Sequence, residues 1–176
     1  LTIALRWSPR AVFVCVPGAY HLDVCISAAR ARAHIFCEVP LALTVDCVDE
    51  LRNLVESNRL LYVPGCQQVF HPLYQQLKKW LQAPQFGKPC FHSQAWGLYL
   101  PAWHPYEDYR QFYASDARQG GGNLDVLAHE VTVAAWLTGQ RIAKVHCQAT
   151  HCSSLEIKGP DHMQMSAITD RGMAVN

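Results

Sequence analysis

The chain has 176 residues, half of them hydrophobic and 16% charged, which leaves room for one ordinary domain or two small pieces of a larger protein and excludes wholesale disorder. Fifteen Lys and Arg stand against fourteen Asp and Glu without a basic tract, so nucleic acid is not an expected partner. The early apolar run at residues 11–17 is too short to cross a bilayer, and we expect a cytoplasmic protein with no membrane partner.

Strand and helix patterns alternate over the first 65 residues. Continuous apolar runs at 11–16, 34–38 and 60–63 predict buried strands, and a proline follows each run within two residues. Helices are predicted at 21–32 and from Thr44 onward, with Thr44 as N-cap and an apolar stripe made by Val45, Val48, Leu51, Leu54 and Val55. This alternation predicts βαβ crossovers and a parallel sheet.

The pattern changes after Gly65. A helix is predicted over 70–81, an aromatic strand over 90–100, and a polar aromatic loop over 101–118. A further helix is predicted over 125–137, with Gly139 as its C-cap. Short alternating segments from residue 141 onward predict antiparallel strands with one exposed face.

Four stretches together carry a family resemblance: AVFVCVPGAYH at 11–21, HIFCEVPLALT at 34–44, FHPLYQQLK at 70–78 and GGGNLDVLAHE at 120–130. In this order and spacing they resemble the glucose-fructose oxidoreductase, inositol dehydrogenase and rhizopine catabolism (Gfo/Idh/MocA) family. The resemblance implies an α/β chain that is incomplete at both ends. Residues 1–66 would form the second half of a Rossmann-like parallel sheet, and residues 67–176 an incomplete α+β domain with an open, mainly antiparallel sheet.

The resemblance further implies NAD or NADP as cofactor, a sugar or sugar-derived hydroxyl as the group oxidised by hydride transfer, and a homo-oligomer formed through the second sheet. The phosphate-binding motif G-x-G-x-x-G is absent from these residues, so we expect the chain alone not to bind NAD or NADP appreciably. In the usual strand order of the fold, the strand at 11–16 would be an unpaired apolar edge, and the chain is expected to self-associate.

Site residues follow from the same resemblance. His129 would exchange the hydroxyl proton and Asp125 would orient the substrate beside it; their spacing of four puts both on one helix face. The residues implied for cofactor binding are Pro17, His21, Glu38 and Pro40. The aromatic residues implied for sugar binding are Tyr99, Trp103, His104 and Tyr109.

One departure from the family pattern concerns catalysis. Val39 stands in Glu38-Val39-Pro40 where the family has a lysine, and valine neither donates a hydrogen bond nor carries charge. Two readings follow from this departure. The chain is a fragment of an enzyme or a catalytically impaired enzyme, or it is a non-catalytic relic of the same fold that binds sugar or mediates association between copies.

The residues alone are also compatible with purely structural roles. Asp125 and His129 could be a surface pair, His21 an ordinary first-turn residue, and the aromatic loop could pack under its own helix. On a strand, His146, Cys147, His151 and Cys152 would point to both faces, so no metal is expected. The eight cysteines are expected to be reduced and mostly buried.

Overall fold

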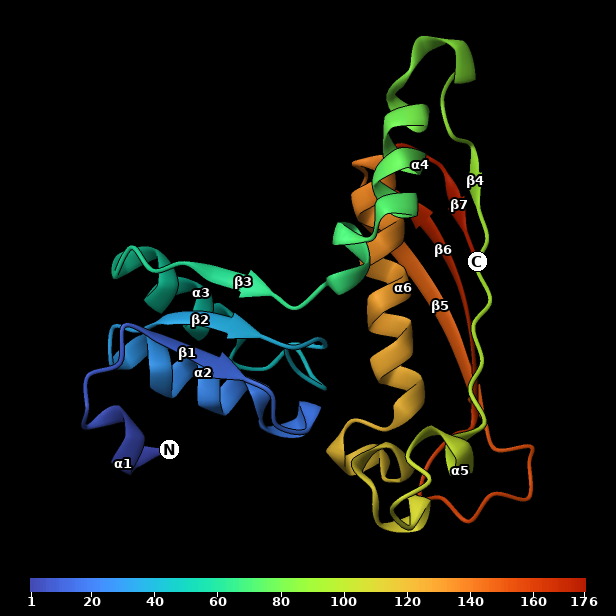
Figure 1. Cartoon of the computed structure of the whole chain (residues 1–176). Coiled ribbons are helices and arrows are strands. Elements are labelled where there is room, and N and C mark those ends of the chain that lie inside the picture. Colours follow the sequence, from blue (N-terminus) through green and yellow to red (C-terminus); the bar gives the residue numbers. More distant parts are fainter. The chain divides into compact units, whose positions relative to one another are not determined.

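The computed structural model describes residues 1–176, apart from the side chain of residue 2, and divides the chain into two units (Figure 1). Unit 1 comprises residues 1–65 and 118–120, and unit 2 comprises residues 66–117 and 121–176. The glycine triplet at 120–122 is thus shared, with its first glycine in unit 1 and the other two in unit 2.

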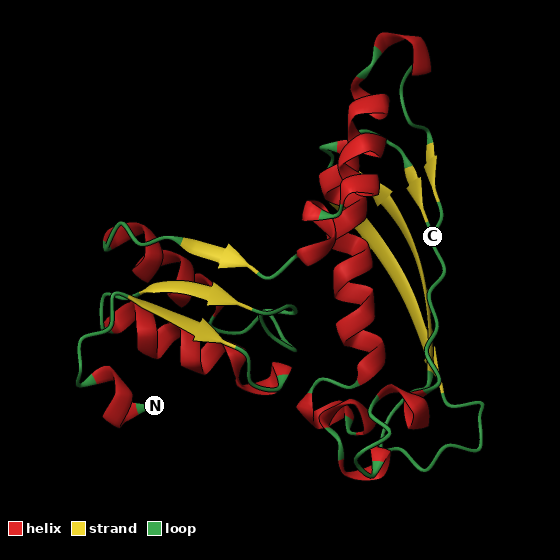
Figure 2. Ribbon diagram, in the orientation of Figure 1, coloured by secondary structure: helices red, strands yellow, loops and turns green.

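Unit 1 contains the predicted parallel sheet, in the order β1-β2-β3. The strands are β1 (Ala11–Val14), β2 (His34–Cys37) and β3 (Tyr62–Pro64), and the helices are α1 (Thr2–Leu5), the 3-10 turn η1 (Gly18–Tyr20), α2 (His21–Arg30) and α3 (Val48–Ser57). Figure 2 shows α2 and α3 against one side of the sheet. The βα alternation read from the sequence is confirmed.

The core of unit 1 lies between its sheet and these helices. Val14, Ile35 and Cys37 point to the helices and are 0–2% exposed, where they pack with Cys25 of α2 and Leu51 of α3. The opposite face of the sheet carries apolar side chains that no helix of this unit covers.

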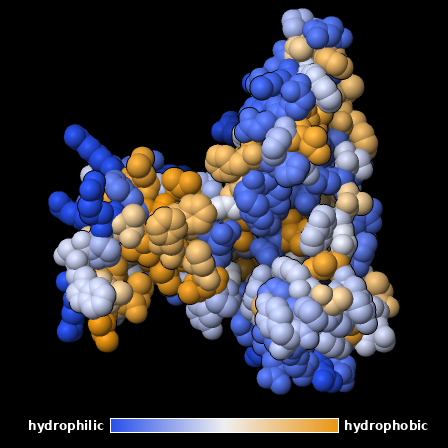
Figure 3. All heavy atoms as spheres, in the orientation of Figure 1, coloured by the Kyte–Doolittle hydropathy of each residue, from blue (hydrophilic) through white to orange (hydrophobic). Residues whose placement is uncertain are grey.

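On that uncovered face Phe13 is 73% and Val63 45% exposed, and the ring of Phe36 lies 5.4 Å from that of Phe13. Figure 3 shows apolar residues gathered over this part of unit 1. β1 has a neighbouring strand on one side only, as predicted for an edge.

The predicted start of the second helix is wrong. α3 begins at Val48, and Thr44 does not cap it. Cys47 precedes the helix in the left-handed conformation, with φ 60°. A right-handed helix cannot continue backward through such a residue. Val45 therefore leaves the apolar stripe and is 89% exposed.

Unit 2 is a four-stranded sheet in the order β4-β7-β6-β5, partly covered by helices. Its strands are β4 (Phe91–His92), β5 (Ile142–Thr150), β6 (His162–Thr169) and β7 (Ala174–Val175), and its helices are α4 (Pro72–Gln82), α5 (Leu100–Trp103) and α6 (Gly122–Thr138). β5, β6 and β7 are antiparallel, as predicted, whereas β4 pairs in parallel with β7. Unit 2 also contains four short 3-10 turns: η2 (Gln67–Phe70), η3 (Pro84–Phe86), η4 (Tyr109–Gln111) and η5 (Tyr113–Ser115). A fifth turn, η6 (Ala117–Gln119), begins in unit 2 and ends in unit 1.

Helix α6 packs on this sheet through Ala134, which contacts a cluster of buried methionine, alanine and valine side chains from β6, β7 and the turn between them. The helix ends as predicted, because Gly139 adopts the left-handed conformation that a C-cap needs. It begins at Gly122, three residues before the predicted start. Along β5 all residues but the first are exposed, so this sheet is open.

The predicted strand over 90–100 is mostly absent. Only Phe91 and His92 are in a strand, because their partner β7 is itself two residues long and offers no further ladder. Part of the predicted loop is helical: its first three residues belong to α5, which begins at Leu100, and the three turns η4 to η6 follow.

Two further observations concern the whole chain. None of the helices in the described residues is long and apolar enough to span a bilayer. All eight cysteines are free, but only Cys25, Cys37 and Cys66 are buried. The prediction of mostly buried thiols is therefore wrong, since the other five lie in loops, at strand ends or on the open strand β5.

Candidate functional site

In unit 1 the three parallel strands end at one edge of the sheet, where open α/β folds bind their ligands. The predicted cofactor residues Pro17 and Glu38 follow β1 and β2, and Gly65 follows β3. A Cβ on Gly65 would lie 2.6 Å from Oε2 and 2.9 Å from Cδ of Glu38. The missing side chain at residue 65 thus makes room for the Glu38 carboxylate, a role that sequence reasoning missed.

His21 joins the segments that follow β1 and β2. The residue is 2% exposed, with Nδ1 2.6 Å from the carbonyl oxygen of Pro40 and Nε2 2.6 Å from that of Val16. A carbonyl oxygen only accepts, so both ring nitrogens donate and the ring is an imidazolium. Burial opposes this charge, but hydrogen bonds to Cys37 and to the two carbonyls outweigh it and raise the pKa of His21 to about 9.

His21 and Pro40, both predicted to bind cofactor, are therefore in direct contact. Because both ring nitrogens are engaged, His21 is suited to positioning the strand ends rather than to donating a hydrogen bond to a ligand. Its role in cofactor binding stays a prediction.

The first glycine of the triplet lies against the turn after β1. Gly120 has φ 124°, a conformation that favours glycine, and a Cβ there would be 3.7 Å from the backbone nitrogen and Cα of Gly18. A Cβ at either glycine would make only ordinary van der Waals contacts, so the positive φ of Gly120, and not the available space, favours glycine here.

In unit 2, α6 carries the predicted catalytic pair on one face. Nε2 of His129 lies 4.0 Å from Oδ1 of Asp125, and the two side chains are 13% and 22% exposed. This separation exceeds a hydrogen bond, so the interaction is electrostatic. Tyr113 donates its hydroxyl to Oδ2 of Asp125 at 3.1 Å. Nδ1 of His129 is buried and has no hydrogen-bond partner among the described residues.

Tyr113, Asp125 and His129 therefore form an array that we call the α6 triad. An imidazole beside a fixed carboxylate can accept a proton, because the carboxylate stabilises the resulting charge. Sequence reasoning named the pair but not Tyr113, which stood among several aromatic residues of the loop. Nothing in the sequence separates it from Tyr106 or Tyr109.

The predicted sugar-binding aromatics are only partly brought together. Trp103 and His104 pack against Phe112, with ring centroids 5.5 Å and 4.4 Å away, and Phe112 packs against Tyr113. A purely structural role, in which the aromatic loop packs on itself, thus describes part of this cluster. His104 also contacts the Glu107 carboxylate at 2.6 Å.

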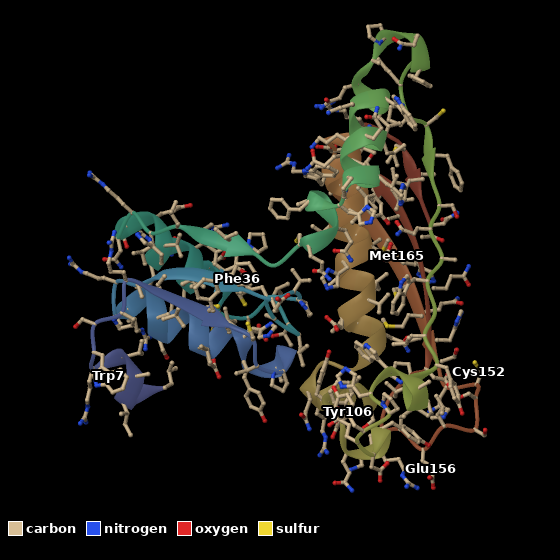
Figure 4. All side chains as sticks on the ribbon, in the orientation of Figure 1. Trp7, Phe36, Tyr106, Cys152, Glu156 and Met165 are labelled. Carbon is tan, nitrogen blue, oxygen red and sulfur yellow. The ribbon has the colours of Figure 1, made fainter. Side chains whose placement is uncertain are left out.

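Two of the predicted sugar-binding residues lie outside that cluster. Tyr99 is 67% exposed, and the hydroxyl of Tyr109 accepts a hydrogen bond from the backbone of Glu156. Figure 4 labels Tyr106 and Glu156 at the end of unit 2 where this aromatic loop lies. A role in binding sugar stays a prediction for all four residues.

A cavity of about 580 Å³ lies within unit 2, lined by α6, β6 and the segment 92–98. Trp103 and Glu130 line it, whereas Asp125 and His129 do not. Oε2 of Glu130 is buried without a hydrogen-bond partner among the described residues, and burial raises the pKa of this carboxyl. Sequence reasoning missed Glu130, although its spacing of four from Val126 on an apolar helix face marked it as a polar residue turned inward.

The described residues contain no group of three or more His, Cys, Asp or Glu side chains arranged to hold a metal ion. His151 contacts Asp161 at 3.8 Å and the carbonyl of Gly159 at 2.9 Å.

Comparison with known proteins gives two family models that match the chain. One, described as "Oxidoreductase family, NAD-binding Rossmann fold", matches residues 3–66, and the other, "GFO/IDH/MocA C-terminal domain", matches residues 74–176. The inositol 2-dehydrogenase of Corynebacterium glutamicum is 31% identical over 153 residues, which are 85% of this chain and 41% of that protein. The myo-inositol 2-dehydrogenase of Thermotoga maritima is 27% identical over 135 residues, 77% of this chain and 38% of that protein.

The chain thus spans about 40% of the length of these curated relatives. Among solved structures, an inositol dehydrogenase homolog from Azotobacter vinelandii complexed with NAD+ superposes with a TM-score of 0.80 at 19% identity, covering 94% of this chain and 44% of that one. An oxidoreductase domain protein from Kribbella flavida superposes with a TM-score of 0.79 at 22% identity, covering 94% and 47%. The predicted α/β fold is confirmed by these likenesses.

Proposed function

We propose, since the chain belongs to the GFO/IDH/MocA family of oxidoreductases, that it supplies the nicotinamide-facing and substrate-facing parts of an enzyme that oxidises a hydroxyl of a sugar-type substrate such as inositol. The observation that carries this proposal is the α6 triad, in which Tyr113 fixes Asp125 and Asp125 lies beside His129.

NAD or NADP would accept the hydride when bound. The residues present fit the nicotinamide end of such a cofactor: the strand ends of unit 1 meet at one edge, and Gly65 leaves space that the Glu38 carboxylate fills. Pro17 and Pro40 border the same edge, and His21 holds the segments around them. The 176 residues contain no G-x-G-x-x-G to bind the pyrophosphate.

His129 would accept the substrate's hydroxyl proton at Nε2. The negative charge of Asp125 stabilises the imidazolium that this produces, and the Tyr113 hydroxyl keeps Asp125 in place. The face of Trp103, together with His104 and the exposed ring of Tyr99, offers an apolar surface for a sugar ring, and Tyr109 lies in the same loop.

A second candidate function rests on Val39. If the missing lysine is essential, the same residues would bind sugar without oxidising it. The open sheet of unit 2, with β5 exposed along nearly its whole length, would support association of copies in either case.

The test uses a fusion protein in which the first half of the Rossmann unit of the Corynebacterium relative precedes this chain and supplies a phosphate-binding segment. Substitutions in this fusion protein distinguish the two functions. NADH formation from myo-inositol should fall about 100-fold or more in His129→Ala, since acid-base groups contribute that much. His146→Ala, which removes an exposed imidazole from β5, should leave the rate unchanged. Val39→Lys should raise the rate.

The parent fusion and its Val39→Lys variant could each bind cofactor and inositol and yet form no NADH. That result would contradict the enzyme function and favour the non-catalytic binding function. The unfused chain supplies a separate check. Calorimetry should detect no NAD binding in the low micromolar range, which would correspond to about −8 kcal/mol. Low micromolar affinity would show that the residues present bind more than the nicotinamide end.

A further inference from the structure

The cavity of unit 2 is large enough for a small organic ligand. Its volume of about 580 Å³ lies in the range of about 300 to 1,000 Å³ typical of ligand sites. Its walls combine the aromatic rings of Trp96 and Trp103 with the amide side chains of Gln94 and Gln164. Apolar faces with a few polar groups are the usual composition of such sites.

The ionisable side chains of the cavity wall are two carboxylic acids and two imidazoles. Glu130 and Asp161 line it together with His92 and His162, and no lysine or arginine is found among the described residues of its wall. The Asp161 carboxylate is already satisfied, because Oδ1 accepts from the backbone of Cys152 at 2.8 Å and Oδ2 from that of Ser153 at 2.7 Å. A hydrogen bond from the Ser153 side chain, together with these backbone hydrogen bonds, holds the pKa of Asp161 below its ordinary value, so it stays ionised.

Glu130 differs from Asp161 in having no partner. Glu130 lines the cavity, and its Oε2 is buried and has no hydrogen-bond partner among the described residues. A buried carboxylate without a partner is costly, and a cation within contact distance removes that cost. Trp96 and Trp103 in the cavity wall favour the same kind of ligand, since aromatic rings attract organic cations.

We propose that this cavity binds a small organic ammonium ion, with Glu130 as its counter-ion and Trp96 and Trp103 as its aromatic walls. The site is distinct from the α6 triad: Asp125 and His129 lie on another face of the helix and do not line the cavity. Binding here therefore depends neither on NAD nor on the proposed proton transfer.

Two sugars of nearly equal shape test the proposal on the full chain. Glucosamine carries an ammonium where glucose carries a hydroxyl, and both can be titrated by calorimetry below about pH 7, where the amine is protonated. Tryptophan fluorescence gives a second readout, because Trp96 and Trp103 line the cavity. Glucosamine should bind at least about 10-fold more tightly than glucose.

Glu130→Gln keeps the size of the side chain and removes its charge, so it should abolish the preference for glucosamine. Glu56→Gln removes the same charge from an exposed position of α3 and should preserve the preference. Ala95→Arg places a cation at an exposed position of the cavity wall, where it should weaken glucosamine binding and leave glucose binding unchanged. Thermal unfolding of each variant shows that it is folded.

Three results would overturn the proposal: equal affinities for the two sugars, no glucosamine binding at millimolar concentration, or a preference that survives Glu130→Gln. The two proposals share Trp103, but the activity of the fusion protein with inositol depends on the α6 triad, whose Asp125 and His129 do not line the cavity. Loss of that activity and loss of the preference for glucosamine are therefore distinguishable.

Discussion

The stability of unit 1 should decrease as the pH rises through about 9, because His21 is charged in the folded chain. Its pKa rises from 6.5 to about 9 on folding. A group whose pKa is raised in the folded state contributes its full stabilisation below the unfolded pKa, near 6.5, and loses it as the pH passes the folded pKa. The stabilisation should therefore be complete at pH 6 and absent at about pH 10.

The structure sets the size of this effect. Each pKa unit corresponds to about 1.4 kcal/mol, so a rise to about 9 represents about 3 kcal/mol. Part of the rise comes from Cys37, whose own pKa is lowered by hydrogen bonds with Cys25 and His21. The carbonyls of Val16 and Pro40 act whatever the charge of that thiol, and two such hydrogen bonds contribute at least about 1 kcal/mol. We expect a loss of between about 1 and about 3 kcal/mol.

Urea unfolding at a series of pH values measures this loss, with unit 1 followed by the amide resonances of buried strand residues such as Ile35. The matched variant is His21→Gln, which can still donate one hydrogen bond but does not titrate. The variant keeps every cysteine, so the difference between the two chains reports His21 together with its interaction with Cys37. A difference that stays constant from pH 6 to about pH 10 would show that His21 is not an imidazolium in the folded state.

Three further predictions concern separate features. Phe13→Ser should weaken self-association in sedimentation measurements, because Phe13 is 73% exposed on the uncovered sheet face. Trp7→Ser changes a more exposed aromatic residue outside the sheet, 83% exposed, and should not weaken it; equal effects would show that the sheet face is not the cause. Gly139→Ala should cost about 1 kcal/mol in thermal unfolding, since φ is 65° there, while Gly97→Ala, with open space and no positive φ, should be nearly neutral. A thiol reagent should label the five exposed cysteines of the native chain and leave the three buried ones unlabelled. Mass spectrometry counts the labels on each chain and so tests this expectation.

The sequence alone predicted the features that depend on neighbouring residues. Alternating apolar runs and helical stripes identified the parallel strands, and Gly139 identified the end of α6, because side-chain periodicity and the left-handed conformation are local properties of the chain. For the same reason the spacing of four placed Asp125 and His129 on one helix face.

Tertiary structure decided the features that need a distant partner. The length of β4 depends on β7, more than eighty residues later, and the left-handed Cys47 moves the start of α3 past Thr44. Tyr113 becomes part of the candidate site only because folding brings its hydroxyl to Asp125.

The charge of His21 and the unpaired carboxyl of Glu130 follow the same rule. His21 is an imidazolium because the carbonyls of Val16 and Pro40 meet at its ring, and Glu130 is unpaired because the residues that enclose it come from separate segments. Periodicity shows which way a side chain points along its own element. Only the packed structure determines which groups it meets, and those groups set its charge and its chemistry.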